Sequence, residues 1–460
     1  MKTFLRAMAG FLLVVVLFGF TVWRQDAFPD LSGLTNFIVD TVDRLNDIKS
    51  GGANLSALGE RPTDENAEFP QYDVSTAIDP ELEELVYTAM LNREPEIDIS
   101  GYALSQDSLQ AFVSQVRFLH PDLFFVGKQF NFTKDDQNDV IMVLKPQYLY
   151  EEAEHNAKMA AYQGYVQAIA AGAPADGTEF DKVLYLHDYF VREYSYDNTY
   201  TIRDAYTFFE QKTGVCQAYM LAFIAVAEEL GIQSVPVTSS RMNHAWNMVK
   251  VDGNWYHVDV TWDDTAGYPS QISYAYFLQS DAGIINIDKD NVDESKAEPD
   301  WHCDWSCTQK ATETRYDNAV WRTSQTPIVK GNGQYYCVVY TEVDEKQNRS
   351  GAIYAGDNPA VMGEILPVNS IWRAEGGEMY YVGCYAGLAL YGDLLIYNTH
   401  NTLRAYNVVE KRDYLIKIFA EIGTDCIYGI ADVGEDGTVH CVVAAAASGD
   451  TYYLIDHKLP

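Results

Sequence analysis

The sequence predicts an α+β fold in which a core of helices and strands is followed by an all-β module. Two observations carry this prediction. Between about residues 79 and 309, apolar residues at helical spacing alternate with short runs at strand spacing. Beyond about residue 310, short runs rich in Tyr and Val alternate with Gly, Asp and Asn turns, which is typical of repeated β-hairpins.

The composition limits both the class of protein and its partners. Of 460 residues, 66 are Asp or Glu and 32 are Lys or Arg, which gives a formal net charge of −34. With 47% hydrophobic residues the chain is too apolar to be disordered, and its length suits two or three domains. Because so acidic a chain repels phosphate groups, we expect no nucleic-acid partner and no binding flat on an anionic lipid surface.

The N-terminus predicts export. Lys2 and Arg6 precede an apolar run of 17 residues, 7–23, and Arg24 follows it. A positive segment before an apolar one is typical of a secretory signal, and this run lies at the short end for a membrane-spanning helix. No A-x-A-like cleavage site follows, so we expect 1–24 to be a signal anchor, with a cleaved signal peptide as the alternative. The rest of the chain is then extracellular, held at the cell surface or secreted, and meets the membrane through this segment only.

Shifts in composition divide the rest of the chain. Residues 25–78 predict a stalk helix followed by a linker rich in Gly, Pro, Ser and acidic residues. Residues 79–179 predict an N-terminal α+β region, and residues 180–309 predict the catalytic core. Residues 310–460 predict the all-β module, for which a partial propeller and a sandwich both stay open.

The α+β region contains four predicted elements. Asp79 followed by Pro80 marks the start of a first helix, and the pair His120-Pro121 ends a second. The runs at 123–132 and 140–146 predict two strands joined by a polar turn. None of these elements carries a chemical signature.

Cysteine usage separates one thiol from the others. The chain has seven cysteines, of which six lie beyond residue 300 and Cys216 stands alone. In an exported protein those six could form up to three disulfides, whose pairing the sequence does not give. Cys303 and Cys307 lie close together with His302 beside them, but a zinc site needs a second pair of ligands, which the sequence lacks. We therefore expect no metal and no cofactor, and we expect Cys216 to be a free thiol.

Residues 213–231 predict a buried helix whose first turn holds Cys216. Apolar residues recur there at three- and four-residue steps, and Gly231 ends the helix. N–H groups in the first turn of a helix lack helical partners, so their partial positive charge favours a thiolate and can stabilise an oxyanion beside the sulfur. A lone Cys at a helix start is more often structural, so a nucleophile needs a base and an orienting acid nearby.

The segment at 243–264 predicts a β-hairpin that supplies both. Two alternating runs flank Asp252-Gly253, which is the strongest short-range signal for a two-residue turn. With that turn, Val251 pairs with Asn254 and the register of the whole hairpin follows.

On this register the hairpin places an imidazole beside a carboxylate. Asp259 faces Trp246, and His244 lies on the same sheet face as Asp259, as its diagonal neighbour about 7–8 Å away at the backbone. We predict that Cys216 is the nucleophile, that His244 is the general base, and that Asp259 holds the imidazole.

Some residues compete for these roles. His257 shares the same face and is the rival base. Asp263 and Asp264 are rival carboxylates, although they follow the paired length of the hairpin. The contact between Cys216 and His244 does not follow from the pattern, because a helix start and a strand meet only through the fold.

The stretch from about 180 to 264 resembles a bacterial transglutaminase-like domain of the papain-like cysteine-enzyme superfamily. The matching pieces are LHDYFVREYSYD, DAYTFFEQKTGVCQAY and NHAWNMVKVDGNWYHVDVTWDD. The resemblance implies a helix carrying the cysteine, packed on an antiparallel sheet, and it implies Cys216, His244 and Asp259 as a catalytic triad. Ala218 departs from the glycine of many relatives, which narrows the space near the nucleophile.

These observations together predict an exported cysteine enzyme that acts on carboxamides of proteins or peptides. Attack by the thiolate gives a thioester, which an amine resolves to a cross-link and water resolves to a hydrolysis product. The alternative is a catalytically silent binding protein at the cell surface, whose C-terminal β module recognises wall polymer or a partner protein.

Overall fold

The computed structural model describes most of the chain beyond the linker. The predicted signal anchor at 1–24 lies outside the described residues, and so does the predicted stalk and linker at 25–78 apart from Val74 and Ile78. Among the described residues, no helix combines the length and apolarity needed to cross a membrane. The described residues are 74, 78–135, 140–264, 271–287, 299, 301–324, 326–343, 349–368, 386–445 and 452–459.

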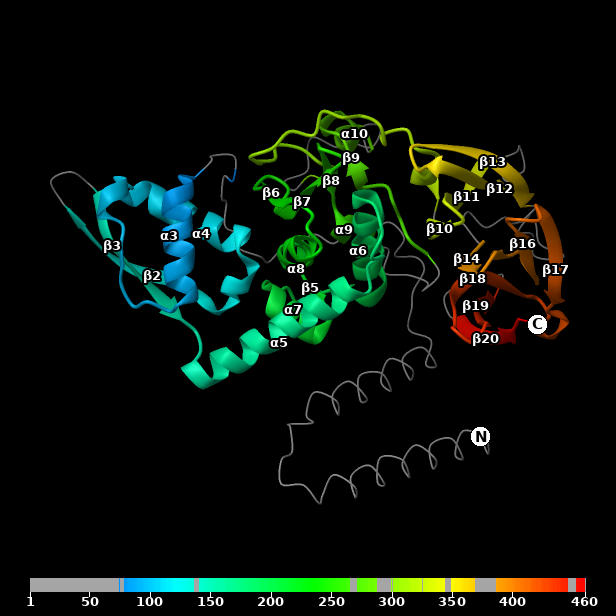
Figure 1. Ribbon diagram of the computed structural model, residues 1–460, viewed down its shortest axis with the longest axis horizontal. Helices are drawn as coiled ribbons and strands as arrows, with labels where there is room; N and C mark the ends of the chain where they lie inside the picture. Colours follow the sequence, from blue (N-terminus) through cyan, green and yellow to red (C-terminus); the bar gives the residue numbers. More distant parts are fainter. Residues whose placement is uncertain are drawn as a thin grey trace, which may run out of the picture.

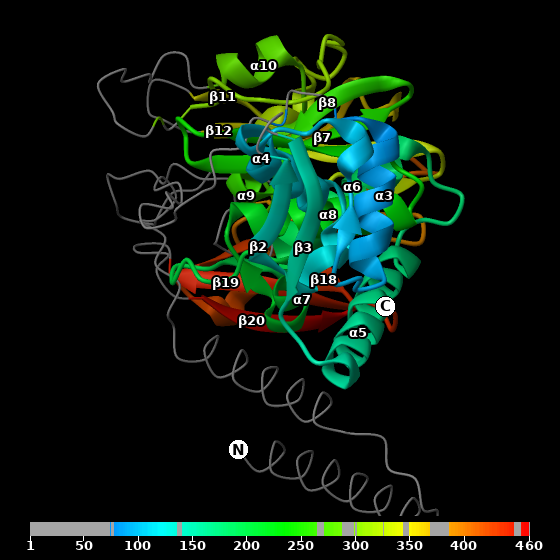
Figure 2. The same ribbon diagram turned by 90° about the vertical axis from the view of Figure 1, so that its left-hand side faces the viewer.

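Figure 1 shows three parts of the chain following one another along the long axis of the molecule. The N-terminal α+β region occupies one end, a mixed helix and sheet core lies in the middle, and antiparallel sheets occupy the other end. The predicted α+β fold with an all-β C-terminal module is confirmed. Figure 2 views the N-terminal region end-on, with β2, β3 and α3 towards the viewer.

The N-terminal region packs helices against a three-stranded antiparallel sheet of order β1-β3-β2. Asp79 caps the first helix as predicted, because its carboxylate accepts hydrogen bonds from two first-turn N–H groups. The second predicted helix also ends at His120, as expected. The elements are α3 (Pro80–Leu91), β1 (Ile97–Asp98), η2 (Ser100–Tyr102), α4 (Gln106–Leu119), η3 (Pro121–Phe125), β2 (Val126–Asp135), β3 (Val140–Tyr148) and α5 (Glu152–Ala171).

One predicted strand begins later than its apolar run suggested. The run at 123–132 starts with the 3-10 helix η3, and strand β2 begins only at Val126. Leu123, Phe124 and Phe125 are all buried. Three consecutive buried side chains fit a helical turn pressed into the core, whereas a strand would turn alternate side chains away.

The middle part packs helices against one antiparallel sheet of order β6-β7-β8-β9. Helix α8 packs against β6 and β7 on one side and against α5, α6 and α7 on others. The elements are α6 (Glu179–Glu193), β4 (Ser195–Tyr196), α7 (Ala205–Gln211), β5 (Thr213–Gly214), α8 (Cys216–Glu229), β6 (Ser234–Ser239), β7 (His244–Val251), β8 (Asn254–Val258), α9 (Val260–Asp263), β9 (Phe277–Gln279) and α10 (Asp281–Asn286).

Helix α8 is the central element of this core. Every residue from Cys216 to Ala227 is buried, so the helix has no solvent face and its position is fixed from all sides. The strand that begins at His244 packs directly on it. The fold therefore brings the start of α8 and the start of β7 into one packed region.

The C-terminal part consists of successive antiparallel sheets, each with its strands in chain order. Strands β10, β14 and β18 begin the three sheets, and β14 contacts both β10 and β18. The elements are η4 (Val320–Thr323), β10 (Val329–Gly331), β11 (Gln334–Val343), β12 (Arg349–Asn358), β13 (Val361–Val368), β14 (Leu388–Tyr391), β15 (Leu394–Asn398), β16 (Thr402–Asn407), β17 (Arg412–Ile418), η5 (Ala420–Ile422), β18 (Asp425–Val433), β19 (Thr438–Ala445) and β20 (Tyr452–Lys458).

The first of these sheets belongs to the same hydrophobic core as the middle part. Tyr335, Cys337 and Val339 on β11 pack in the cluster that also contains the apolar residues of α6 and α8. A second cluster joins the first sheet to the second, and a third cluster joins the second sheet to the third.

Candidate active site

The structure places Cys216 as the first residue of α8. The cap residue is Val215, whose side chain offers no hydrogen bond to the first turn, so the positive end of the helix is not neutralised by a cap. Cys216 is only 1% exposed. The thiol therefore lies at the amide end of a buried helix, as the sequence predicted.

The backbone before Cys216 is held by a short parallel bridge. Strand β5 pairs with β4, and Val215 N–H donates to Ile202 O at 3.0 Å. The carboxylate of Asp197 accepts from the backbone N–H groups of Thr199, Thr201 and Ile202, which fixes the loop that carries this carbonyl. Local hydrogen bonds thus set the approach to the helix.

Position 214 requires glycine because a larger residue would clash with its neighbours. A Cβ at Gly214 would lie 2.6 Å from Phe208 Cδ2 and 2.7 Å from Ala218 Cβ. Ala218, the residue that departs from the glycine of many relatives, therefore packs against Gly214 and is fully buried.

The predicted hairpin is confirmed as far as Val258. Asp252 and Gly253 both adopt positive φ, which a two-residue type I′ turn requires, and Val251 pairs with Asn254. The pairing continues to Asn247 and Val258.

The predicted register is wrong beyond that point. Asp259 does not pair with Trp246, because β8 ends at Val258 and Asp259 becomes the N-cap of α9. The Oδ1 atom of Asp259 accepts from Trp262 N–H at 3.1 Å, which stabilises the helix start in place of a further strand residue.

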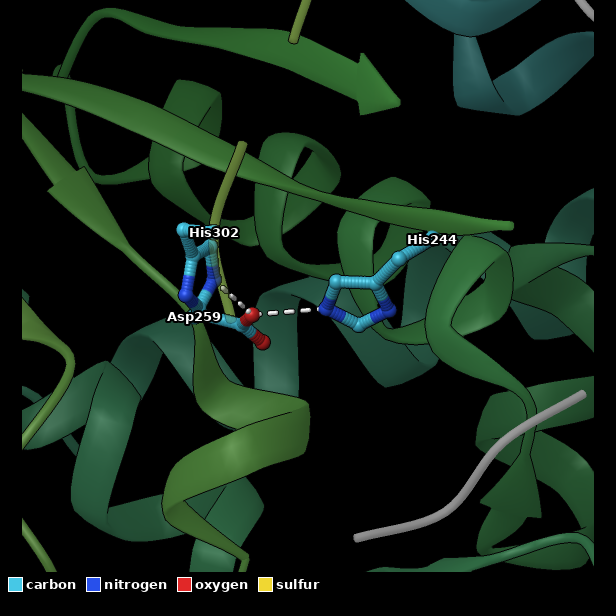
Figure 3. Close-up of side chains that lie close together, drawn as sticks. All are labelled: His244, Asp259 and His302. Carbon is cyan, nitrogen blue, oxygen red and sulfur yellow. Dashed lines mark hydrogen bonds and ion pairs between the residues drawn. The ribbon is translucent and has the colours of Figure 1, made fainter. Parts of the chain in front are cut away.

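His244 and Asp259 nevertheless meet. His244 Nε2 lies 2.6 Å from Asp259 Oδ2, and both side chains are buried (Figure 3). The rings of Trp246 and Trp262 both stack on the imidazole, at 5.5 and 5.0 Å between centroids. Two indole faces and one carboxylate thus hold the ring in place and favour its cationic form.

The protonation equilibria of the pair point the same way. Burial lowers the pKa of His244, but the charge and hydrogen bond of Asp259 outweigh burial and raise the pKa to about 10. A hydrogen bond with Cys216 and the charge on its sulfur contribute to this rise in the pKa of His244. Burial also raises the pKa of Asp259, but His244 outweighs it and holds that pKa below its ordinary range. The structure thus favours an imidazolium between a carboxylate and a sulfur.

A family model described as the transglutaminase-like superfamily matches residues 163–260. The chain carries a transglutaminase-like domain. This match includes Cys216, His244 and Asp259, and it extends into α5, before the stretch whose motifs carried the resemblance.

Comparisons with whole proteins add little to this. No curated protein matches the chain. A candidate cysteine protease from Cytophaga hutchinsonii is 13% identical, with a TM-score of 0.20, over 29% of this chain and 61% of that one. A structure described as a TGase is 13% identical, with a TM-score of 0.21, over 45% of this chain and 56% of that one. The chain spans less than two thirds of either protein, and likenesses of this size carry no argument about the reaction.

His257, the rival base, uses both of its ring nitrogens in other hydrogen bonds. His257 Nδ1 accepts from Trp246 Nε1–H at 2.9 Å, and its Nε2 donates to Asp281 Oδ1 at 3.0 Å. Burial lowers the pKa of His257, although Asp281 opposes this, so the ring is neutral. His257 therefore anchors the indole that stacks on His244, which is a structural task.

The rival carboxylates also have other partners. Asp263 accepts from Ser273 Oγ at 2.6 Å and lies 3.3 Å from His187 Nε2, while Asp264 accepts from Tyr219 Oη at 2.6 Å. These three interactions tie the end of α9 to neighbouring parts of the chain.

Sequence reasoning missed His302. Its Nε2 lies 2.9 Å from Asp259 Oδ2, the same oxygen that His244 contacts. The two residues lie 43 positions apart in the chain, and no local spacing connects them. The sequence drew attention to His302 only as a neighbour of two cysteines.

His244, Asp259 and His302 contribute ligand-type atoms that all lie within 4.8 Å of one another. In this structure the two Nε2 atoms instead share one carboxylate oxygen through hydrogen bonds at 2.6 and 2.9 Å. A carboxylate that accepts from two imidazoles needs no ion to satisfy it. The three side chains therefore form one hydrogen-bonded group.

The cysteines of the described residues are free thiols. The disulfides that the later cysteines of an exported protein could form are absent among the described residues, because Cys303, Cys307, Cys337, Cys426 and Cys441 are all unpaired. Burial raises the pKa of Cys307 to about 11 and that of Cys441 to about 12. Both of these thiols are therefore protonated at neutral pH.

Proposed function

We propose that the transglutaminase-like domain is a cysteine enzyme that forms a thioester with carboxamides of proteins or peptides. The observation that carries the proposal is the buried series Cys216, His244 and Asp259, in which the imidazole interacts with the sulfur and with the carboxylate. Such a series converts a weak nucleophile into an ion pair ready to attack a carbonyl carbon.

The first half of the proposed reaction acylates the sulfur. The thiolate of Cys216 forms a bond to the carbonyl carbon of the carboxamide, and the first-turn amides of α8 stabilise the developing oxyanion. The C–N bond then breaks, and the leaving ammonia or amine takes a proton from His244. A thioester on Cys216 and a neutral His244 remain.

The second half releases the acyl group. An amine or a water molecule attacks the thioester carbonyl while His244 accepts its proton, and the Cys216 thiolate leaves. An amine acceptor gives a cross-link or an exchanged amide, and water gives proteolysis or deamidation. The net charge of −34 favours basic substrates and cationic amines near the site.

Thiol reactivity tests the proposal directly. Iodoacetamide at neutral pH, with the modified peptides quantified by mass spectrometry, should label Cys216 much faster than the buried Cys337 or Cys441. His244→Ala should slow labelling of Cys216 to the rate of those thiols. Equal rates in the unmodified protein would overturn the proposal.

A second candidate is a catalytically silent binding protein. The observation that favours it is the 1% exposure of Cys216, which leaves a substrate carbonyl no direct path to the sulfur. In that case Cys216 labels slowly, His244→Ala changes nothing, and a fluorescent primary amine is not incorporated into a glutamine-containing peptide. The C-terminal sheets would then supply the surface that binds wall polymer or a partner protein.

We also propose that the protein acts outside the cell, attached through its N-terminal segment. Lys2 and Arg6 before the apolar run at 7–23 support this location. Protease added to intact cells should degrade an extracellular chain and spare one that faces the cytoplasm.

A further inference from the structure

His302 occupies a fixed position beside the proposed catalytic group. The side chain is fully buried, and its loop is tied to β6 by two backbone hydrogen bonds between Ser306 and Thr238, at 2.7 and 3.1 Å. Ser239 Oγ also donates to Cys303 O, the carbonyl that follows His302. The imidazole therefore cannot leave its position without disturbing the contacts that hold the segment directly after it.

The carboxylate of Asp259 is fully committed in this arrangement. Its Oδ2 contacts both His244 Nε2 at 2.6 Å and His302 Nε2 at 2.9 Å, and its Oδ1 accepts from Trp262 N–H at 3.1 Å (Figure 3). His302 approaches from the side opposite His244. Without His302, one donor fewer would oppose rotation of the carboxylate away from the base.

The ionisation state of His302 fixes which way this bond points. Burial lowers the pKa of His302 to about 4, although the hydrogen bond to Asp259 opposes this. The ring is therefore neutral, and because its partner is a carboxylate, Nε2 carries the proton and donates it. The N–H dipole of the neutral His302 ring therefore interacts with the negative charge of Asp259. The only positive charge among His244, Asp259 and His302 is then on His244.

The other nitrogen of His302 shows that the residue is not the most stable choice for its position. Nδ1 is buried and has no hydrogen-bond partner within the described part of the chain. A leucine would fill a similar volume between Trp246 and Trp262 without burying a bare acceptor. The hydrogen bond to Asp259 is the contribution of His302 that a leucine could not make.

We propose that His302 is a positioning residue of the active site, which acts on the reaction through Asp259. It holds the carboxylate towards His244 and shares the charge of Oδ2, so that the imidazolium keeps its orientation and can still release its proton to the leaving group. This inference rests on the proposed function, because it assigns a role within that site.

Two matched variants test it. His302→Leu removes the donor and keeps the volume, whereas His302→Gln can return an N–H near the position of Nε2. The first readout is the proton NMR signal of His244 Nε2–H, which a short bond to a carboxylate moves far downfield, and which is assigned by its loss in His244→Ala. The second readout is the rate at which iodoacetamide labels Cys216.

We expect His302→Leu to shift or broaden the downfield signal and to slow labelling of Cys216 about tenfold. His302→Gln should restore both readouts to within about threefold of the unmodified protein. A leucine variant with an unchanged signal and an unchanged labelling rate would overturn the inference. If His302→Leu prevents folding, His302→Met takes its place with the same two outcomes, because the side chain of methionine adapts its shape to the site.

The two readouts separate this inference from the proposed function. If Cys216 of the unmodified protein labels no faster than Cys337, the enzyme proposal fails, while the NMR signal still reports whether His302 orients Asp259. If Cys216 labels fast and His302→Leu changes neither readout, only the role of His302 fails.

Discussion

Two buried histidine–aspartate pairs lie in the same core, and they differ in what the second ring nitrogen meets. His244 contacts one carboxylate, Asp259, and interacts with the sulfur of Cys216. His187 on α6 contacts two carboxylates, with Nε2 3.3 Å from Asp263 and Nδ1 3.0 Å from Asp188. A histidine between two acids has no nitrogen left for a nucleophile.

The comparison shows that a raised pKa does not identify a catalytic histidine. Burial lowers the pKa of His187, but its hydrogen bonds to Asp188 and Asp263 outweigh burial and raise the pKa to about 9. The pKa of His244 is raised to about 10 by Asp259 in the same way. The two pairs differ in their third partner. His244 has the thiol of Cys216, as a catalytic histidine requires, whereas His187 has a second carboxylate.

The largest expected effect is on reactivity, and it belongs to the His244 pair alone. His244→Ala should reduce the rate of amine incorporation by roughly 10³–10⁴-fold, because the thiolate loses its base and counter-ion. His187→Gln, the matched control, should leave the rate per folded molecule within about threefold. A loss of similar size in the control would show that the two pairs are not functionally distinct.

The second effect is on stability, and it belongs to the His187 pair. His187→Leu leaves the buried Asp263 and the partly buried Asp188 without their shared donor, so we expect a loss of about 3–5 kcal/mol in the free energy of unfolding. Urea unfolding followed by tryptophan fluorescence measures this. A loss under about 1 kcal/mol would mean that water or their remaining donors, Tyr274 Oη for Asp188 and Ser273 Oγ for Asp263, satisfy both carboxylates after the change.

The third prediction concerns pH. A folded-state pKa raised above the ordinary 6.5 means that His187 contributes stability fully below pH 6.5 and loses this contribution as the pH rises through about 9. The gap in unfolding free energy between the protein and His187→Gln should therefore narrow between pH 6.5 and pH 10. A gap that stays constant over that range would show that His187 is neutral in the folded protein.

The smallest effect tests the turn that leads to the nucleophile. Gly214→Ala would place a methyl group 2.6 Å from Phe208 and 2.7 Å from Ala218, so we expect a loss of about 1–3 kcal/mol in stability. Ala218→Gly in the same protein opens space and should recover part of that loss. Melting temperatures of the two single variants and the double variant measure the coupling.

The parts of the site that were predictable depend on local rules. The position of Cys216 at a helix start follows from apolar periodicity and Gly231, and the register from Val251 to Val258 follows from the Asp-Gly turn. Both are set by residues close in the chain, which is why the sequence suffices for them.

The parts that were not predictable depend on contacts between distant segments. The run H-V-D-V-T predicts a continuing strand because β-branched residues favour strands. Asp259 caps α9 instead, because its carboxylate accepts a hydrogen bond from the backbone N–H of Trp262. The contact between His302 and Asp259 arises only when the loop after α10 folds back on β6. No pattern within the sequence encodes that return.

The contact between α6 and the first C-terminal sheet limits where the chain can be cut into fragments that still fold. Asp181 closes the capping box of α6. Its carboxylate also accepts hydrogen bonds from two residues of that sheet, Tyr335 Oη at 2.7 Å and Lys330 Nζ at 2.5 Å. The buried guanidinium of Arg322 donates to the carbonyl of Leu278, which belongs to β9. A fragment ending at residue 309 would strip α6 and β9 of these partners, so we expect the middle part to need at least the first C-terminal sheet in order to fold.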